Sequence, residues 1–486
     1  MIKTLCLAVF CSCLILPGKA QSNGDISWLS VANRQQLELL AGYIAQAPYL
    51  GLQGNDYQPA FIRSVLDNTS SLATAADTAE TETLINHLAL QFFSDVAYGR
   101  LALSPVKYNG PSYDPVCDKH LADNMALYLS AGRFSSFLGA IEPATVEYLA
   151  VKNKIAFFRQ QLADSSFSDA VVAGLNVDTS NKLLLTRLSQ YGVLDGTSAD
   201  SITTTELQQK LAIVQRMFNL LPDGTLRGNV LKALNVPFAV RLRELEQALN
   251  QLRWLQCARQ RFSMVVVNIP SCGLTLYQQG KPALYSRVVV GKRSNPTPTL
   301  CSRIDEVVLY PYWTVPYKIA TRELLPHIKR DISYLEANQF EVLDGKGRIV
   351  DPALVNWQAL DAGNFPYVLR QGTGCDNSLG IVKLNFYNPY SVYLHDTPWK
   401  SLFMLNQRFF SHGCIRVEEA APLARLLLGN EAAGMDTLIV KGWRPGQRPV
   451  SMKLHETVYV FILYNTAWPD ENGDVHFYSD EYKTIN

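Results

Sequence analysis

One short segment combines the residue types that nucleophilic catalysis needs. Ser411, His412, Gly413, Cys414 and Arg416 fall within a single stretch of the chain. A cysteine attacks a carbonyl carbon as its thiolate, so it needs a base or a positive environment that lowers its pKa from about 8.5. Gly413 lets the backbone turn sharply before the sulfur, and the N–H groups of Gly413 and Cys414 could meet a developing oxyanion. The segment therefore predicts a cysteine nucleophile.

The residues after this segment predict a helix. Val417 to Leu428 is closed by Gly429 and carries Glu418 and Glu419 in its first turn. Cys414 would then lie just upstream of a helix N-terminus, whose dipole and free N–H groups favour a thiolate.

Two of the seven histidines lie close to the cysteine in the sequence. His395 ends the apolar run Val392 to Leu394 and precedes turn residues, so we expect it at the end of a strand, where it could act as a base. His412 is two residues from Cys414, a spacing that suits a structural contact better than proton transfer.

A zinc site is the competing reading of the same residues. His395, Asp396, His412 and Cys414 are all acceptable zinc ligands. The segments lack the paired C-x-x-C or H-E-x-x-H spacing that makes metal motifs specific. We therefore expect neither a metal nor another cofactor. The remaining alternative, a buried cysteine and histidine with no chemical role, leaves the clustering unexplained.

Short strands separated by polar turns must position these residues. Residues 262–444 are rich in β-branched and aromatic runs, which predicts a β-sandwich or barrel. An insertion at about 315–372 has mixed helical character and is too long for a hairpin loop, so we expect it to cover the site. The expected strands are 262–269, 275–277, 285–290, 303–310, 379–386, 390–394 and 438–441.

The rest of the chain predicts an α+β protein of several domains. Residues 21–180 have helical spacing and predict a helical scaffold, 181–237 a unit of three helices, and 238–261 a linking helix. Residues 445–486 predict a hairpin, from 458–464 and 475–478, that packs back on the sheet.

Composition limits the classes of partner. The 486 residues include 44 Lys and Arg against 43 Asp and Glu, a formal charge of +1. So balanced a chain has no general attraction to phosphate backbones, and we expect no nucleic-acid binding. With 48% hydrophobic and 18% charged residues, the chain is expected to be globular and long enough for about three domains.

The first residues resemble an export signal. Lys3 precedes an apolar run, Leu5 to Leu16, and Gly18 to Ala20 offers small residues for cleavage after Ala20. A membrane anchor is the alternative, but the run is shorter than the ~20 residues that a bilayer needs. We expect residues 1–20 to be a signal peptide and the mature protein to be soluble and exported. Six cysteines would remain, and their pairing cannot be read from spacing.

The two motifs together resemble a known family. His395 followed by Ser411-His412-Gly413-Cys414, with the run LGIVKLNFYNPYSVYLHDTP, is similar to the L,D-transpeptidases with a YkuD-type catalytic domain, in their large multidomain branch. The segment VQRMFNLLPDGTLRGNVLKALN within 181–237 resembles the small three-helix peptidoglycan-binding domain, although a generic helical linker is the alternative.

The resemblance implies a reaction and a role for each matching residue. Cys414 would attack the third residue of a peptidoglycan tetrapeptide stem, with His395 as general base, and a second stem would resolve the thioester into a 3→3 crosslink. The Ser411 carbonyl would orient the imidazole, Gly413 and Cys414 would form the oxyanion hole, and His412 would support them. The resemblance implies that Arg416 holds the loop or meets a substrate carboxylate, with a salt bridge to Glu418 or Glu419 as the alternative.

Tyr393 and Trp399 are candidate substrate walls, unless they are ordinary packing residues. Donor and acceptor stems are the expected partners, and the helical N-terminal part would contact other cell-wall synthesis proteins. Two other functions stay open, a thiol amide hydrolase that releases the terminal residue to water and a non-catalytic wall-binding protein. An exported enzyme acting on the cell wall would lie in the periplasm.

Overall fold

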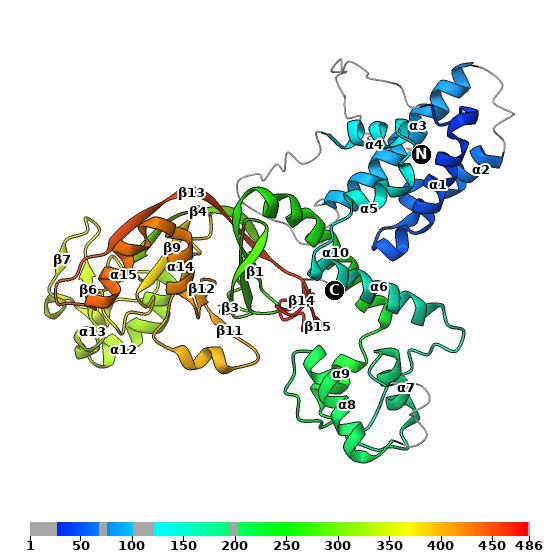
Figure 1. The fold of residues 1–486 in the computed structure, drawn as a ribbon. Helices are drawn as coiled ribbons and strands as arrows, with labels where there is room; N and C mark the ends of the chain where they lie inside the picture. Colours follow the sequence, from blue (N-terminus) through cyan, green and yellow to red (C-terminus); the bar gives the residue numbers. More distant parts are fainter. Residues whose placement is uncertain (1–26, 68–74, 101–119, 195–201, 485–486) are drawn as a thin grey trace, which may run out of the picture.

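The computed structural model describes residues 27–67, 75–100, 120–194 and 202–484, so the expected signal peptide lies outside the described residues. A group of N-terminal helices, a long helix, a unit of three short helices, a second long helix and a large sheet follow one another along the chain (Figure 1). In the described part of the chain, no helix has the length and apolar character needed to cross a bilayer.

The N-terminal helices enclose their own aromatic core. Apolar side chains at three- and four-residue steps, such as Leu37, Leu40 and Ile44, are buried as the periodicity predicts. The rings of Phe92, Phe93 and Phe134 join them in this core. The helices are α1 (Arg34–Ala45), α2 (Pro59–Asp67), α3 (Ala75–Tyr98), α4 (Leu121–Ser130) and α5 (Phe137–Ile141).

Two long helices, α6 (Val146–Ala163) and α10 (Phe238–Arg261), pack together in the centre of the molecule (Figure 1). Between them in sequence lie three short helices that share their core: α7 (Lys182–Gln190), α8 (Thr204–Met217) and α9 (Gly228–Leu234).

The turn between α8 and α9 is built around one buried amide. The Gln215 side chain accepts from the Gly224 N–H at 2.8 Å and donates to the Asp223 carboxylate at 3.0 Å. Gly224 has a φ of +69°, and a Cβ there would lie 2.6 Å from the Gln208 carbonyl, so this turn requires glycine. The Pro-Asp-Gly motif therefore acts here as a tightly packed turn.

The central sheet closes on itself. Eight strands follow the order β3-β12-β10-β9-β4-β13-β1-β2, and β2 pairs again with β3, so the sheet forms a barrel. The short strand β11 (Phe409–Ser411) adds to β3. The ring strands are β1 (Ser263–Asn268), β2 (Gly273–Gln278), β3 (Lys281–Gly291), β4 (Leu300–Leu309), β9 (Val382–Phe386), β10 (Leu394–His395), β12 (Ile415–Val417) and β13 (Val450–Leu463).

Two expectations about the C-terminal part were wrong. The strand expected at 458–464 does not pair with 475–478. It is the end of β13, which starts at Val450 and forms part of the barrel wall between β1 and β4. The hairpin is instead β14 (Ala467–Pro469) with β15 (Val475–Phe477). Residues 438–441 belong to the helix α15 (Ala432–Lys441), because a short apolar run alone does not distinguish strand from helix.

A separate unit is inserted between β4 and β9. It holds a four-stranded sheet in the order β5-β8-β6-β7, three short helices and its own apolar core. Figure 1 shows it at the end of the barrel away from the N-terminal helices. Its elements are β5 (Trp313–Thr314), α11 (Tyr317–Ile319), the π-helical turn η9 (Ala320–Leu324), α12 (Leu325–Arg330), α13 (Ser333–Ala337), β6 (Phe340–Leu343), β7 (Ile349–Val350) and β8 (Val368–Gln371).

Candidate active site

The sheet register places the cysteine segment beside the histidine segment. Strands β10 and β12 are parallel neighbours, with Leu394 opposite Ile415 and His395 opposite Arg416. The Ile415 N–H donates to the Tyr393 carbonyl at 3.0 Å, which continues the register to Cys414. Leu394 and Ile415 are fully buried in the barrel core.

Alternation along the two strands puts the chemical groups on one face. Because successive side chains point to opposite faces, Cys414 and Arg416 lie opposite to Ile415, on the same face as Tyr393 and His395. Lys383 of β9 pairs with His395 and belongs to this face as well. The structure therefore brings together the cysteine and the histidine that the motifs singled out, and adds a lysine that no sequence pattern indicated.

His395 is buried and has a defined tautomer. Its Nδ1 lies 2.6 Å from the Asp396 carbonyl oxygen, which can only accept, so Nδ1 carries the proton and donates. Nε2 then keeps its lone pair. Burial lowers the pKa of His395 to about 3, and the charge of Arg416 contributes. The imidazole is therefore neutral, the form that a general base requires.

The prediction that the Ser411 carbonyl orients the imidazole was wrong. The Ser411 carbonyl accepts the Lys292 N–H at 2.9 Å, whereas the bond to Nδ1 comes from Asp396, the residue next to His395. Because Asp396 directly follows His395, this hydrogen bond forms without any contact between distant parts of the chain.

The Asp396 side chain fixes this part of the chain. Its carboxylate accepts from the Ile381 N–H at 3.0 Å and pairs with Lys400 at 2.6 Å. A Cβ at Gly380 would lie 2.3 Å from that carboxylate, so glycine is required there. Asp396 therefore has a structural role that its position beside the histidine did not reveal.

Cys414 is a partly exposed thiol with a raised pKa. Its sulfur donates to the Ser391 carbonyl across 3.9 Å. Burial raises the pKa and outweighs hydrogen bonds from Tyr393 and the charges of Lys383 and Arg416, which lower it. The thiol is thus protonated at neutral pH, and attack requires a base that removes the proton.

The expected help from a helix dipole was wrong. Strand β12 follows Cys414 directly, and α14 (Ala420–Leu428) begins only at Ala420. Dipole effects fall off within the first turn of a helix, so α14 does not activate the thiol.

The turn before the cysteine depends on Gly413. Its φ of +116° is a conformation that L side chains rarely adopt. The Ser411 hydroxyl donates to the Cys414 carbonyl at 2.5 Å and accepts from the Gly413 N–H at 3.2 Å. The Gly413 N–H is therefore engaged within the turn, which leaves the Cys414 N–H as the candidate oxyanion donor of the two.

His412 contacts the inserted unit. Its Nε2 lies 2.6 Å from a Glu323 carboxylate oxygen and 3.4 Å from the Lys292 ammonium nitrogen. Glu323 belongs to η9. This exposed histidine therefore joins the cysteine loop to the insertion and lies apart from the buried His395. No sequence signal pointed to Glu323.

Arg416 lies beside an aromatic ring and forms no ion pair with a carboxylate in the described part of the chain. Its guanidinium lies 5.2 Å from the centre of the Trp399 ring, and its Nε is buried without a hydrogen-bond partner among the described residues. The alternative salt bridge is not formed with Glu418, which accepts from Arg287 at 2.7 Å.

The two candidate wall residues differ in exposure. Trp399 is 49% exposed beside Arg416. The Tyr393 ring contacts His395 edge-on at 5.6 Å and lies under the Lys383 ammonium group at 4.2 Å. Tyr393 is thus packed within the site, while Trp399 presents a free surface.

The described histidine, cysteine, aspartate and glutamate side chains do not form any group of three or more that could hold a metal ion. Of the four residues that the zinc reading requires, Asp396 pairs with Lys400 and His412 pairs with Glu323.

The other described cysteines differ from Cys414. Burial raises the pKa of Cys272 to about 11 and that of Cys301 to about 12, while Cys375 is exposed. Cys257 is disulfide-bonded.

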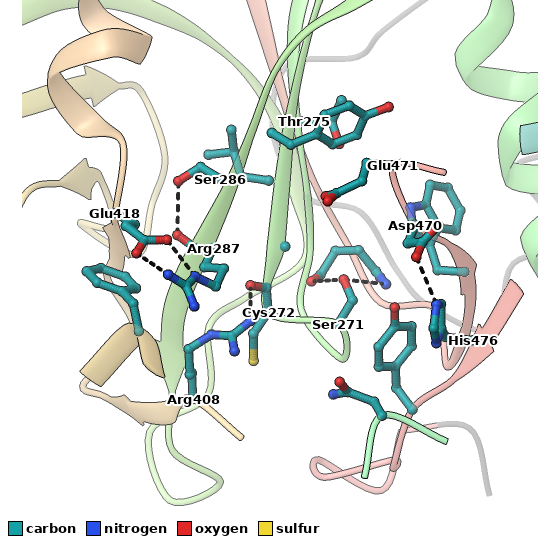
Figure 2. A pocket seen from close by; sticks show the side chains of 18 of the residues that line it. Ser271, Cys272, Thr275, Ser286, Arg287, Arg408, Glu418, Asp470, Glu471 and His476 are labelled. Carbon is teal, nitrogen blue, oxygen red and sulfur yellow. Dashed lines mark hydrogen bonds and ion pairs between the residues drawn. The ribbon is translucent and has the colours of Figure 1, made fainter. Parts of the chain in front are cut away.

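A separate hollow is lined by other residues. It has a volume of 940 Å³ and is bordered by β2, β3 and the β14–β15 hairpin. Figure 2 shows Arg287 paired with Glu418, and His476 paired with Asp470, within it. Neither Cys414 nor His395 lines it, so the hollow is distinct from the candidate active site.

Comparison with known proteins finds a family to which part of this chain is similar. Residues 263–440 match the model of the YkuD L,D-transpeptidase catalytic domain, and residues 20–155 match a model described as a scaffold domain. A protein of Haemophilus influenzae, provisionally named as an L,D-transpeptidase, is 38% identical over 218 residues. That match covers 45% of this chain and 44% of the relative, so the chain spans less than half of the relative's length in the alignment.

Two solved structures share low similarity with the chain. One is the Ldtfm–avibactam carbamoyl enzyme, with 14% identity, a TM-score of 0.20, and coverage of 41% of this chain and 48% of that one. The other is an L,D-transpeptidase from Mycobacterium smegmatis, with 14% identity, a TM-score of 0.19, and coverage of 41% and 58%. Scores this low add nothing to the fold described above. The family model thus shows that residues 263–440 are similar to the YkuD-type catalytic domain of L,D-transpeptidases, and the curated relative agrees with this likeness.

Proposed function

We propose that this protein is an L,D-transpeptidase that forms 3→3 peptidoglycan crosslinks through an acyl-enzyme on Cys414. The observation that carries the proposal is the shared face of β10 and β12, where a neutral, tautomerically defined imidazole lies on the strand next to the thiol. The match to the L,D-transpeptidase model supports peptidoglycan stems as the substrate class, and in this proposal the donor stem is a tetrapeptide.

The first step forms a thioester. His395 Nε2 takes the proton from the Cys414 sulfur as that sulfur attacks the carbonyl carbon of the third stem residue. The negative charge that develops on the carbonyl oxygen is met by the Cys414 N–H. The C–N bond then breaks, and the imidazolium returns the proton to the departing amine of the terminal D-alanine.

The second step transfers the acyl group to another stem. The side-chain amine of the acceptor attacks the thioester, His395 takes a proton from the nitrogen, and the Cys414 thiolate leaves and is reprotonated. In this proposal the guanidinium of Arg416, beside the exposed Trp399 ring, binds a substrate carboxylate. Trp399 and Tyr393 serve as walls for the stem.

The remaining parts have supporting roles in this proposal. The three helices α7, α8 and α9 bind the glycan or peptide of the wall, and the N-terminal helices bind other cell-wall synthesis proteins. Residues 1–20 direct export, and the enzyme works in the periplasm. The inserted unit acts as a lid that excludes water from the thioester, which the contact of Glu323 with His412 supports.

The nature of the products tests the reaction class. We expect incubation with purified disaccharide tetrapeptide to give crosslinked dimers and free D-alanine, measured by chromatography with mass spectrometry. Trimmed monomers without any dimer would instead support the hydrolase, in which water resolves the thioester. Binding to sacculi without either product would support the wall-binding protein.

Breaking the contact between the inserted unit and the cysteine loop tests whether the unit acts as a lid. Glu323→Ala removes the carboxylate next to His412, so water should reach the thioester more often and the ratio of trimmed monomer to dimer should rise. Because the pair is partly exposed and worth at most about 1 kcal/mol, the increase should be no more than about fivefold.

The matched control for this variant is Glu336→Ala, which removes an exposed carboxylate from α13 of the same unit. An unchanged ratio in Glu323→Ala, or an equal rise in Glu336→Ala, would contradict the lid.

A further inference from the structure

A buried hydroxyl group holds the peptide bond between Gly413 and Cys414. The Thr297 hydroxyl donates to the Gly413 carbonyl oxygen at 2.8 Å and accepts from the Gly291 N–H at 2.8 Å. Thr297 is only 2% exposed. With both bonds formed, the direction of this hydroxyl proton is determined, and it points at the Gly413 oxygen.

The geometry of a peptide unit turns this bond into a constraint on the site. In a planar trans peptide, the carbonyl oxygen of one residue and the N–H of the next point in opposite directions. The oxygen of Gly413 and the N–H of Cys414 belong to the same plane, so fixing one direction fixes the other. The bond also polarises the unit and strengthens its N–H as a donor.

Gly413 has no side chain that could fix the direction of this peptide unit. Its φ of +116° lies in a region where glycine has wide freedom, so the peptide unit that follows could rotate. A Cβ at Gly413 would lie 3.6 Å from the Pro296 carbonyl, which shows how closely the 292–299 loop packs behind the turn. The restraint must come from that loop.

We infer that Thr297 is a positioning residue that aims the Cys414 N–H at the oxyanion. This inference rests on the proposed acyl transfer and specifies how its oxyanion donor is oriented. Thr297 touches neither substrate nor sulfur and acts only through the Gly413–Cys414 peptide unit.

The C-terminal segment completes the network. The Tyr482 hydroxyl donates to the Gly291 carbonyl at 2.5 Å and accepts from the Thr297 N–H at 3.2 Å. Its ring stacks on Tyr464 of the segment after β13, with ring centres 5.4 Å apart. A Cβ at Gly291 would lie 2.3 Å from the Asn295 carbonyl, so the loop can fold this tightly only on glycine. Tyr482, near the C-terminus, thus helps to hold the backbone of Thr297 in place through these hydrogen bonds.

The test compares two reactions of the same sulfur. Acylation by disaccharide tetrapeptide creates an oxyanion, whereas alkylation by iodoacetamide does not. Thr297→Val keeps the shape of the side chain and removes the hydroxyl. We expect its acylation rate constant to fall by about 10- to 100-fold, carried by kcat more than by KM, with alkylation within about twofold of wild type. Intact-protein mass spectrometry follows both adducts.

Two further variants separate positioning from general damage. Thr297→Ser keeps the hydroxyl and should retain acylation close to wild type. Tyr482→Phe removes the second hydroxyl while Thr297 keeps both of its bonds, so the loss should be smaller than in Thr297→Val. Equal acylation in wild type and Thr297→Val would overturn the inference, as would a parallel loss of acylation and alkylation. A wild-type protein that alkylates but never acylates would instead overturn the proposed function.

Discussion

Replacing Cys414 by alanine is expected to abolish both dimer formation and D-alanine release. Loss of the nucleophile removes the bond on which the two-step transfer depends, and comparable removals in acyl-transfer enzymes lower kcat by roughly six orders of magnitude. The structure predicts little effect on folding, since the thiol is partly exposed and its hydrogen bond to the Ser391 carbonyl spans 3.9 Å. Product analysis with disaccharide tetrapeptide measures the loss, and binding to sacculi should persist.

The same variant identifies the reactive sulfur. A carbapenem should add its mass to wild type at Cys414 and to no other residue, and the adduct should be absent from Cys414→Ala. Cys375→Ala is the matched control, because Cys375 is the exposed free thiol among the described residues. It should form dimers and the adduct as wild type does. An adduct that persists in Cys414→Ala, or is lost in Cys375→Ala, would refute the assignment.

Replacing His395 by glutamine should lower the acylation rate by about 10² to 10⁴-fold, the usual contribution of a positioned general base. The requirement is strict here because burial raises the pKa of the Cys414 thiol, so few molecules carry a spontaneous thiolate at neutral pH. Stopped-flow measurement of acyl-enzyme formation gives the rate. His412→Gln provides the comparison, since that histidine binds Glu323, and its loss should be much smaller.

The pH dependence follows from the depressed pKa of His395. With a pKa of about 3, the base stays neutral from pH 8 down to pH 5, so acylation should not decline around pH 6.5 as it would for an ordinary histidine. In the unfolded chain His395 binds a proton below about pH 6.5, whereas in the folded protein it stays neutral down to about pH 3. The contribution of His395 to folding stability is therefore fully present above pH 6.5 and is lost as the pH falls toward 3. A decline of acylation centred near pH 6.5 would contradict this account.

Much of the fold was predictable from local patterns. The apolar periodicity of Ala239 to Leu255 lies within α10, and the short β-branched runs at 262–269 and 303–310 lie within or overlap β1 and β4. In these elements the apolar residues recur with the period of a helix or a strand, and the side chains at those positions are the buried ones. The prediction of a strand at 438–441 failed because three apolar residues in a row have no period, and their place in α15 depends on packing against the barrel.

The C-terminal strand shows a second limit. Residues 475–478 follow a clear turn, so pairing them with 458–464 was the local solution. The long strand β13 instead completes the barrel between β1 and β4, where residues Val458 to Ile462 pair with both neighbours and Val460 and Ile462 are fully buried. The gain from closing the sheet outweighs a hairpin of two strands, and no local pattern carries that information.

By itself, the sequence determined which side chains could perform acyl transfer: a cysteine after a glycine in a polar segment, and a histidine after an apolar run. Reactive groups and local periodicity belong to single residues and their neighbours. Only the tertiary structure decided that Cys414 precedes a strand and no helix, that Asp396 orients the imidazole, and that Thr297 and Glu323 contact the cysteine loop. The Thr297 and Glu323 contacts join residues far apart in the chain, and barrel closure and side-chain packing, which no local pattern encodes, bring them within hydrogen-bond distance.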